Sequence, residues 1–94
     1  MVLTIKFIGA LRHITGKTQL TINNEKEISL KELLAKMNQE TPNLKKIFDD
    51  SQAGDSASNS LILVNGKEIS VLDGLETKLC DGDEIVFVPV VHGG

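Results

Sequence analysis

The sequence is poor in cysteine and in aromatic residues. Its 94 residues include one cysteine, Cys80, three phenylalanines, and no tryptophan or tyrosine. A single cysteine excludes an intramolecular disulfide framework and a cage of several cysteines around zinc or an iron–sulfur cluster. Nucleic-acid-binding surfaces usually combine a concentrated basic face with aromatic side chains for stacking. We therefore expect no direct contact with nucleic acid.

Long apolar segments and targeting signals are also missing. No apolar run approaches the ~18 residues that a membrane-spanning helix needs. No basic region followed by a long apolar stretch opens the sequence. Apolar residues at 40% and charged residues at 24% are ordinary for a globular chain. We expect one cytoplasmic domain over residues 1–94, with a reduced cysteine, no bound cofactor and no membrane contact.

Acidic residues are scarce in the first half of the sequence, and basic residues in the second. Residues 1–46 contain eight Lys or Arg and four Asp or Glu, whereas residues 47–94 contain two and nine. The halves therefore carry +4 and −7, for a net charge of −3. The acidic half would suit a basic protein partner, although a solvated surface is the commoner cause of such a bias.

The first residues alternate between apolar and polar side chains. In residues 2–8 this alternation places three apolar side chains on one face, Leu3, Ile5 and Phe7. It predicts a half-buried strand, with Ile8 exposed on the opposite, polar face. Residues 18–22 resume the alternation, so the two segments are expected to form a hairpin. We expect a turn at Gly16-Lys17 and a loosely structured corner over residues 12–15.

A helix is predicted next. Ser29 and Glu32 have the spacing of a capping box, in which each side chain accepts a hydrogen bond from a backbone N–H at the helix start. The following apolar residues fall on one helical stripe: Leu30, Leu33, Leu34 and Met37. The helix should end at Thr41-Pro42, because the residue before a proline disfavours helical geometry. A second short turn is expected after Pro42.

The second half of the sequence contains short strands and turns. Residues 49–59 have no large apolar side chain, so we expect a mobile loop there. Residues 61–64 and 67–69 flank Asn65-Gly66, the strongest short hairpin signal. Residues 85–91 are apolar on both faces, which is typical of a strand in the middle of a sheet.

The order of these segments predicts an α+β domain, with one main helix packed on one face of a mixed sheet. The other face then leaves part of the last strand uncovered, including Val86 and Val88, together with Ile8. Exposed apolar patches on small domains frequently mark interaction sites. We therefore expect a partner-docking surface at these three residues.

Residues suited to catalysis are isolated. The sequence has no glycine-rich phosphate-binding loop, zinc-protease motif or nucleophile elbow. His13, His92 and Cys80 are separate from one another, and we expect Cys80 to be a small packed side chain. Asp83 and Glu84 point to opposite sides of a strand and cannot share a substrate. The chain is therefore not expected to be an enzyme by itself.

The end of the sequence offers a different kind of reactive group. Residues 90–94 follow the last predicted strand and read Val-Val-His-Gly-Gly. Five extended residues reach roughly 17 Å, and glycines lack a Cβ, so such a tail fits a narrow channel in another protein. A carboxylate becomes reactive once it is joined to an adenylate, and an unhindered Gly94 leaves room for an attacking nucleophile. We expect residues 90–94 to be a flexible tail.

The sequence resembles the MoaD/ThiS sulfur carriers of the β-grasp (ubiquitin-like) superfamily. The resemblance is carried by Leu79-x-Asp81-Gly82-Asp83-Glu84-Ile85 and by Phe87-Val88-Pro89-x-Val91-x-Gly93-Gly94, with support from Ile5-x-Phe7, Leu11-Arg12, Gly16 and Asn65-Gly66. It covers nearly the whole chain apart from residues 49–59, and the sequence resembles MoaD in size more than the shorter ThiS.

The resemblance implies a function. An activating enzyme of the MoeB, ThiF or ubiquitin-activating type would use ATP to adenylate Gly94, with Gly93 as the flexible lead. A persulfide sulfur donor would then convert the carboxyl group into a thiocarboxylate. In the MoaD branch the chain would be the small subunit of molybdopterin synthase, beside a MoaE-like large subunit. Ile8 and Val88 match apolar positions at which the family's partners dock.

Two tail residues depart from the MoaD pattern and keep other functions open. Val90 stands where many MoaD tails have a second proline, and His92 where they have a small residue. A His-Gly-Gly ending is more similar to the ubiquitin-related modifier. The alternatives are a protein modifier conjugated to lysines, a sulfur carrier for tRNA thiolation, and an interaction module that is never activated.

Overall fold

The computed structural model describes residues 1–40 and 60–89. The predicted loop at 49–59, the turn expected after Pro42 and the C-terminal segment 90–94 lie outside the described residues. The prediction of a single domain with a mobile loop and a flexible tail therefore stays a prediction.

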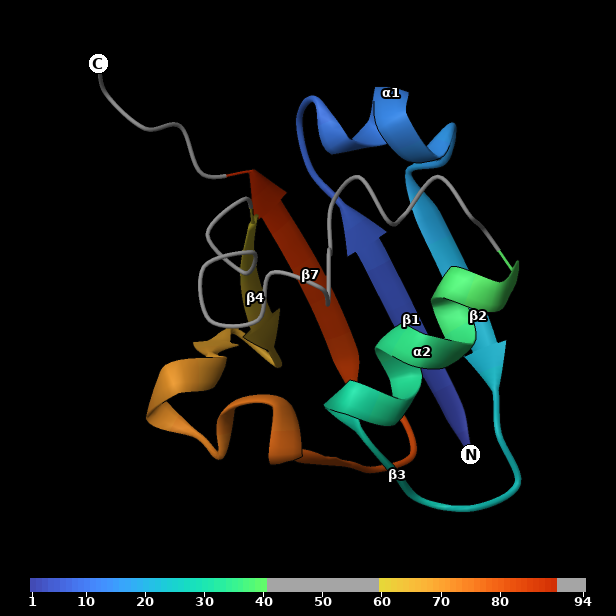
Figure 1. Cartoon of the computed structure of the whole chain (residues 1–94), viewed down its shortest axis with the longest axis vertical. Coiled ribbons are helices and arrows are strands. Elements are labelled where there is room, and N and C mark those ends of the chain that lie inside the picture. Colours follow the sequence, from blue (N-terminus) through green and yellow to red (C-terminus); the bar gives the residue numbers. More distant parts are fainter. Residues whose placement is uncertain (41–59, 90–94) are drawn as a thin grey trace.

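The described chain forms a five-stranded sheet, a two-stranded sheet and two α-helices (Figure 1). The elements in chain order are β1 (Val2–Phe7), α1 (Leu11–Thr15), β2 (Gln19–Asn23), β3 (Ile28–Ser29), α2 (Leu30–Glu40), β4 (Ser60–Val64), β5 (Lys67–Glu68), the 3₁₀ helices η4 (Ile69–Val71) and η5 (Gly74–Glu76), β6 (Lys78–Leu79) and β7 (Glu84–Pro89). The large sheet has the order β2-β1-β7-β4-β5, and β3 pairs with β6.

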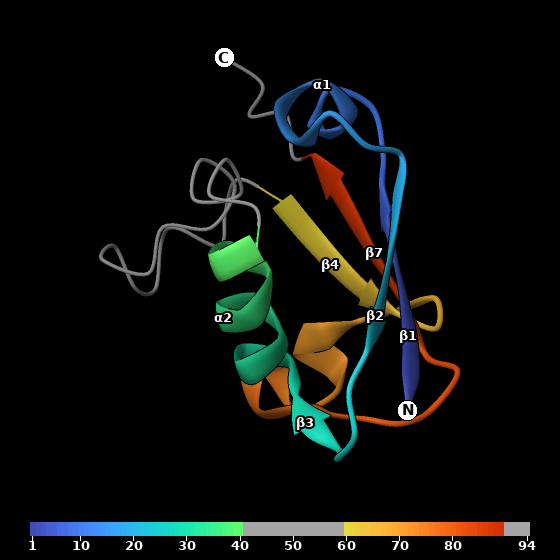
Figure 2. The same ribbon diagram turned by 90° about the vertical axis from the view of Figure 1, so that its right-hand side faces the viewer.

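The large sheet is mixed and has β7 at its centre. β1 and β7 are parallel, whereas β1·β2, β4·β7 and β4·β5 are antiparallel. Helix α2 lies across one face of this sheet (Figure 2). The α+β prediction, the central position of the last strand and the placement of the helix on one face are confirmed.

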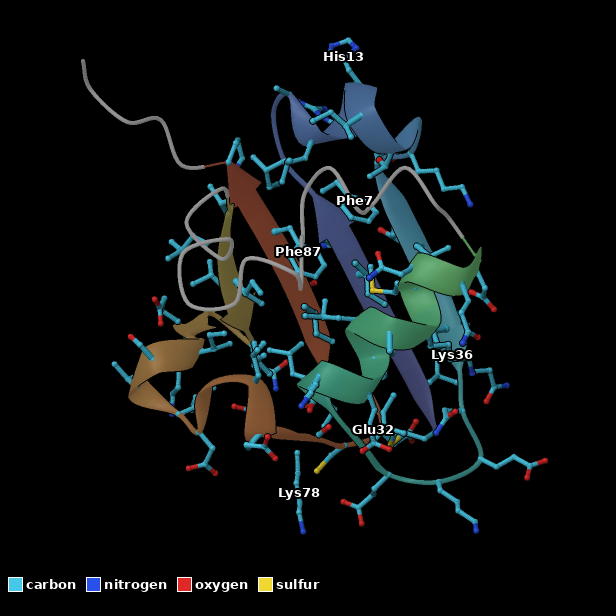
Figure 3. The ribbon with its side chains drawn as sticks, in the orientation of Figure 1. Phe7, His13, Glu32, Lys36, Lys78 and Phe87 are labelled. Carbon is cyan, nitrogen blue, oxygen red and sulfur yellow. The ribbon has the colours of Figure 1, made fainter. Side chains whose placement is uncertain are left out.

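The core lies between α2 and the sheet. Its buried apolar side chains are Leu3, Ile5, Phe7, Leu11, Ile22, Leu30, Leu33, Leu34, Met37, Ile62, Val64, Leu79, Ile85 and Phe87. The register sets Phe7 beside Phe87, and their rings stack with centroids 5.7 Å apart. Both rings lie on the α2 side of the sheet (Figure 3). All three inward positions predicted in the first strand are buried.

The predicted capping box at the helix start is confirmed by both of its hydrogen bonds. The N–H of Ser29 donates to Glu32 Oε1 at 3.0 Å, and the N–H of Glu32 donates to Ser29 Oγ at 3.2 Å. The four residues of the predicted apolar stripe are buried. The predicted hairpin at Asn65-Gly66 is also confirmed, because both residues have positive φ (51° and 84°), as a type I′ turn requires.

The expectation of a loose corner at residues 12–15 was wrong, because α1 forms there. Thr15 is buried, and its Oγ1 donates to the carbonyl of Leu11 at 3.0 Å. Gly16 ends the helix with φ of 74°, and its N–H donates to the carbonyl of Arg12 at 2.8 Å. A five-residue helix is too short to show a helical period in the sequence. Leu11 anchors it in the core, so tertiary packing decides its structure.

None of the helices in the described parts of the chain is long and apolar enough to cross a membrane.

The capping box predicts a specific pH dependence of stability. The backbone N–H of Ser29, and secondarily its hydroxyl, lower the pKa of Glu32 below its usual 4.5. The folded state therefore favours the carboxylate, and this stabilisation is present above pH 4.5 and lost as the pH falls through the lowered pKa. We expect the difference in unfolding free energy between the native chain and Glu32→Gln to shrink below pH 4.5.

Urea unfolding at a series of pH values measures this difference. Glu40→Gln, at the exposed far end of the same helix, is the control and should show no comparable change over that range. Parallel curves for Glu32→Gln and the native chain would contradict the prediction.

Candidate functional site

The end of β7 lies beside the start of α1. The N–H of Ile8 donates to the carbonyl of Phe87 at 3.1 Å, which extends the parallel pairing of β1 and β7 by one residue. Helix α1 therefore sits next to the point where the chain leaves the sheet (Figure 1). Any segment that follows Pro89 starts from this corner.

The sheet face away from α2 carries an apolar patch at the same end. Strand pairing sets Val86 opposite Leu63 and Val88 opposite Leu61, and Ile8 continues β1 next to Val88. Ile8 is 44% exposed and Leu61 36%, while the other three are half-buried. We call these five residues the outer patch.

The outer patch brings together all three predicted docking residues, Ile8, Val86 and Val88. It also includes Leu61 and Leu63, which the sequence analysis missed. The alternation of Leu61 and Leu63 with buried Ile62 and Val64 was visible in the sequence, but nothing local indicated that this strand pairs with β7.

A charged pair borders the outer patch toward the start of β7. Lys6 Nζ lies 2.9 Å from Glu84 Oε2, and both side chains are more than two-fifths exposed. Exposed pairs of this kind contribute about 0–1 kcal/mol to stability. The pair therefore marks a polar boundary of the patch and contributes little to holding β1 against β7.

The tail residues His92, Gly93 and Gly94 lie outside the described residues, so their role stays a prediction. The other residues considered for catalysis do not form a site. His13 projects from α1 away from the body of the molecule (Figure 3). In the described residues 1–40 and 60–89, no three His, Cys, Asp or Glu side chains are arranged to hold a metal ion.

Cys80 is exposed, so the expectation of a packed cysteine was wrong. Leu79 points into the core, and Cys80 follows it with the opposite orientation. Its Sγ lies 3.9 Å from Glu27 Oε2, and its N–H donates to Asp83 Oδ2 at 2.7 Å.

Asp83 and Glu84 have separate structural roles. Asp83 accepts hydrogen bonds from the N–H of Cys80 and, at 2.9 Å, from Asn65 Nδ2. Asn65 in turn accepts the N–H of Glu84 at 3.0 Å. These contacts tie the β4–β5 turn to the start of β7. Glu84 instead pairs with Lys6, so the two acids have different partners.

A hollow of about 450 Å³ lies far from the end of β7 and is lined almost entirely by polar side chains. It opens between the β2–β3 connection and α2, and Lys36 and Glu32 line it (Figure 3). Because it is broad and open, it offers little enclosed surface for a small molecule. Among the described residues, the outer patch is therefore the leading candidate for a functional surface.

Comparison with known proteins identifies the class of protein. The chain is similar over 99% of its length to small archaeal modifier protein 1 from Methanosarcina acetivorans, with 33% identity, a TM-score of 0.77 and 96% of that chain covered. It is also similar to one chain in the structure of the complex of subunits 1 and 2 of the molybdopterin-converting factor from Helicobacter pylori, at 30% identity and a TM-score of 0.61, with this chain and that chain each covered in full. The fold is the β-grasp of ubiquitin-like proteins.

The family follows from the sequence match. The ThiS family model matches residues 5–94, so the chain belongs to the ThiS family. It is also 37% identical over 76 residues to the "Putative sulfur carrier protein" of Archaeoglobus fulgidus, covering 80% of this chain and 83% of that protein. The chain is thus a small ubiquitin-like carrier, either a sulfur carrier or a ubiquitin-like modifier.

The Asp83 contacts predict a loss of stability on mutation. In Asp83→Ala, the N–H of Cys80 and the amide of Asn65 lose their acceptor, although both are accessible to water. We expect unfolding free energy to fall by about 1–2 kcal/mol. Asp73→Ala is the control, because the exposed side chain of Asp73 makes no capping hydrogen bond at the start of η5. This substitution should change the unfolding free energy by less than about 0.5 kcal/mol. Urea unfolding of both variants tests this, and equal stabilities would contradict it.

Proposed function

We propose that the chain is a sulfur carrier whose Gly94 carboxylate is activated by an ATP-dependent enzyme of the MoeB, ThiF or ubiquitin-activating type. The carboxylate attacks the α-phosphorus of ATP, pyrophosphate leaves, and an acyl adenylate forms. The terminal sulfur of a persulfide donor then attacks the acyl carbon and AMP leaves. A thiol reduces the resulting sulfur–sulfur bond and releases the thiocarboxylate.

The observation that carries this proposal is the position of the outer patch. It lies beside the end of β7, and Gly94 is the fifth residue after Pro89. On this proposal, a partner that holds the patch has its active site within about 17 Å of Pro89, the reach of five extended residues. In this proposal the chain supplies the docking surface and the reactive carboxylate, and the enzyme supplies the catalytic groups.

For the final acceptor we propose the precursor of molybdopterin, with this chain as the small subunit beside a MoaE-like large subunit. The likeness to the Helicobacter pylori complex of two molybdopterin-converting subunits supports this choice. We place the exchange in the cytoplasm, where reducing conditions keep thiols free. A MoaE-like protein that binds the native chain and converts the precursor only with its thiocarboxylate form would support the assignment.

Conjugation to lysines through Gly94 is the second candidate. The likeness to an archaeal modifier favours it, as does His92 before the two glycines. In that case digested extracts of the source cells should contain Gly-Gly remnants on lysines that disappear when this chain is deleted. A deep survey without such remnants would contradict conjugation and leave the sulfur carrier as the remaining proposal.

Removal of Gly93 and Gly94 should abolish activation. The shortened chain has no unhindered glycine carboxylate to attack ATP, so we expect no ATP–pyrophosphate exchange with the activating enzyme. It keeps the outer patch and should still compete with the native chain for binding, which is the control. ATP–pyrophosphate exchange at the native rate by the shortened chain would contradict the proposal.

A charge in the outer patch should weaken docking. In Val88→Asp, partner binding must strip water from a carboxylate, so we expect the Kd for the activating enzyme to rise at least about tenfold, or 1.4 kcal/mol. Val71→Asp makes the same change at a 72% exposed valine on η4 and is the matched control. Isothermal titration calorimetry compares the two. Equal Kd values would show that the patch is not the docking surface.

A further inference from the structure

Gly9 lies against the ring of Pro89, the last described residue of the chain. A Cβ placed on Gly9 would lie 3.3 Å from Pro89 Cγ and 3.8 Å from Cδ. The first distance is tighter than ordinary van der Waals contact, so any side chain at this position would push the ring. Gly9 also has φ of +59°, which a residue with a side chain rarely adopts.

The backbone around Gly9 is held on both sides. Before it, the N–H of Ile8 donates to the carbonyl of Phe87. After it, the N–H of Arg12 donates to the carbonyl of Gly9 at 3.1 Å, at the start of α1. Gly9 therefore cannot readily move away from Pro89, and a clash between them is relieved mainly by moving the proline.

Pro89 fits the same corner for a second reason. In a parallel ladder, residue 89 would donate its N–H to the carbonyl of Ile8. Proline has no N–H, and that carbonyl instead accepts the N–H of Leu11 at 3.2 Å. The proline thus ends the pairing of β7 with β1 where α1 begins. The ring then contacts the glycine rather than continuing the ladder.

We propose that Gly9 is a positioning residue for the reactive C-terminal segment: its bare backbone seats Pro89 and so fixes the direction in which the chain leaves the sheet. The inference rests on the proposed function, because it concerns how Gly94 is delivered to the activating enzyme. A displacement at Pro89 changes the point and the direction from which residues 90–94 start. The outer patch stays in place, since four of its five residues lie in β4 and β7 and the N–H of the fifth, Ile8, is bonded to the carbonyl of Phe87.

The chain offers a matched control for this inference. Gly74 has the same φ of +59°, and a Cβ there would meet nothing within 4 Å. Gly9→Ala and Gly74→Ala therefore both place a side chain at the same unfavourable φ, and only Gly9→Ala touches Pro89. Differences between the two variants report the contact with the proline.

Steady-state ATP–pyrophosphate exchange, with the Kd measured separately, gives the test. We expect Gly9→Ala to lower kcat by about tenfold, because small misplacements of a reacting group are costly. Its Kd should stay within about twofold of the native value, and Gly74→Ala should change neither quantity. Equal kcat values for the two variants overturn the proposal. A loss confined to Kd also overturns it, because Gly9 would then act through docking.

Removing the ring of Pro89 provides a second measurement, which also tests the proposal if Gly9→Ala fails to fold. Pro89→Ala deletes Cγ and Cδ and should lower kcat with little change in Kd. In the Pro89→Ala background, Gly9→Ala should cost less than about twofold more, because the clash has lost its partner. Full additivity of the two substitutions, or a native kcat for Pro89→Ala, contradicts the proposal.

Nuclear magnetic resonance separates this inference from the proposed function. If the native chain supports no ATP–pyrophosphate exchange, the proposed function fails. The contact between Gly9 and Pro89 is then still tested in the free protein. We expect a nuclear Overhauser effect between Gly9 Hα and Pro89 Hγ in the native chain. The amide signals of residues 90–94 should shift in Gly9→Ala and not in Gly74→Ala. No such effect, or equal shifts in both variants, overturns the role of Gly9.

Discussion

Parallel pairing between β1 and β7 joins the two ends of the described chain at the middle of the sheet. It brings Ile5 beside Ile85 and Phe7 beside Phe87, and all four side chains are buried. Each contributes about 1.5–3 kcal/mol by leaving water, whereas the exposed pair of Lys6 and Glu84 contributes about 0–1 kcal/mol. Apolar contact, and not the ion pair, therefore sets the register.

The features we connect with function depend on that register. Shifting β7 by one residue against β1 would exchange the buried and exposed sides of the strand. Val86 and Val88 would turn toward α2, and Phe87 would turn outward. Pro89 would also lose its place against Gly9. Stability, the outer patch and the place of Pro89 are thus consequences of the same strand pairing.

Local signals accounted for the parts of the fold that local physics decides. The capping box of Ser29 and Glu32, the alternation of β1 and the turn at Asn65-Gly66 each depend on neighbouring residues, and each was predicted. The exposure of Cys80 was not, because it depends on how a two-residue strand is oriented over the core.

Contacts between distant residues explain what was missed at the candidate site. Ile8, Val86 and Val88 were predicted together, but Leu61 and Leu63 join them only through the pairing of β4 with β7. Gly9 gave no sequence signal, because a single glycine after a strand is common in turns. Its significance depends on a proline eighty positions later, which only the folded chain brings close.

The outer patch is small for a surface that holds a stable complex. Stable complexes bury about 1,600 Å² of surface in total, around fully desolvated anchors. Here five aliphatic side chains, none more than 44% exposed, offer on the order of a few hundred Å² of apolar contact. On the proposed function, a larger patch would hold each partner longer and slow the transfer to the next. A partner of this small patch would then gain most of its selectivity by binding the chain end as well. If Gly94 is the reactive group, its attachment beside this surface makes recognition and reaction parts of one event.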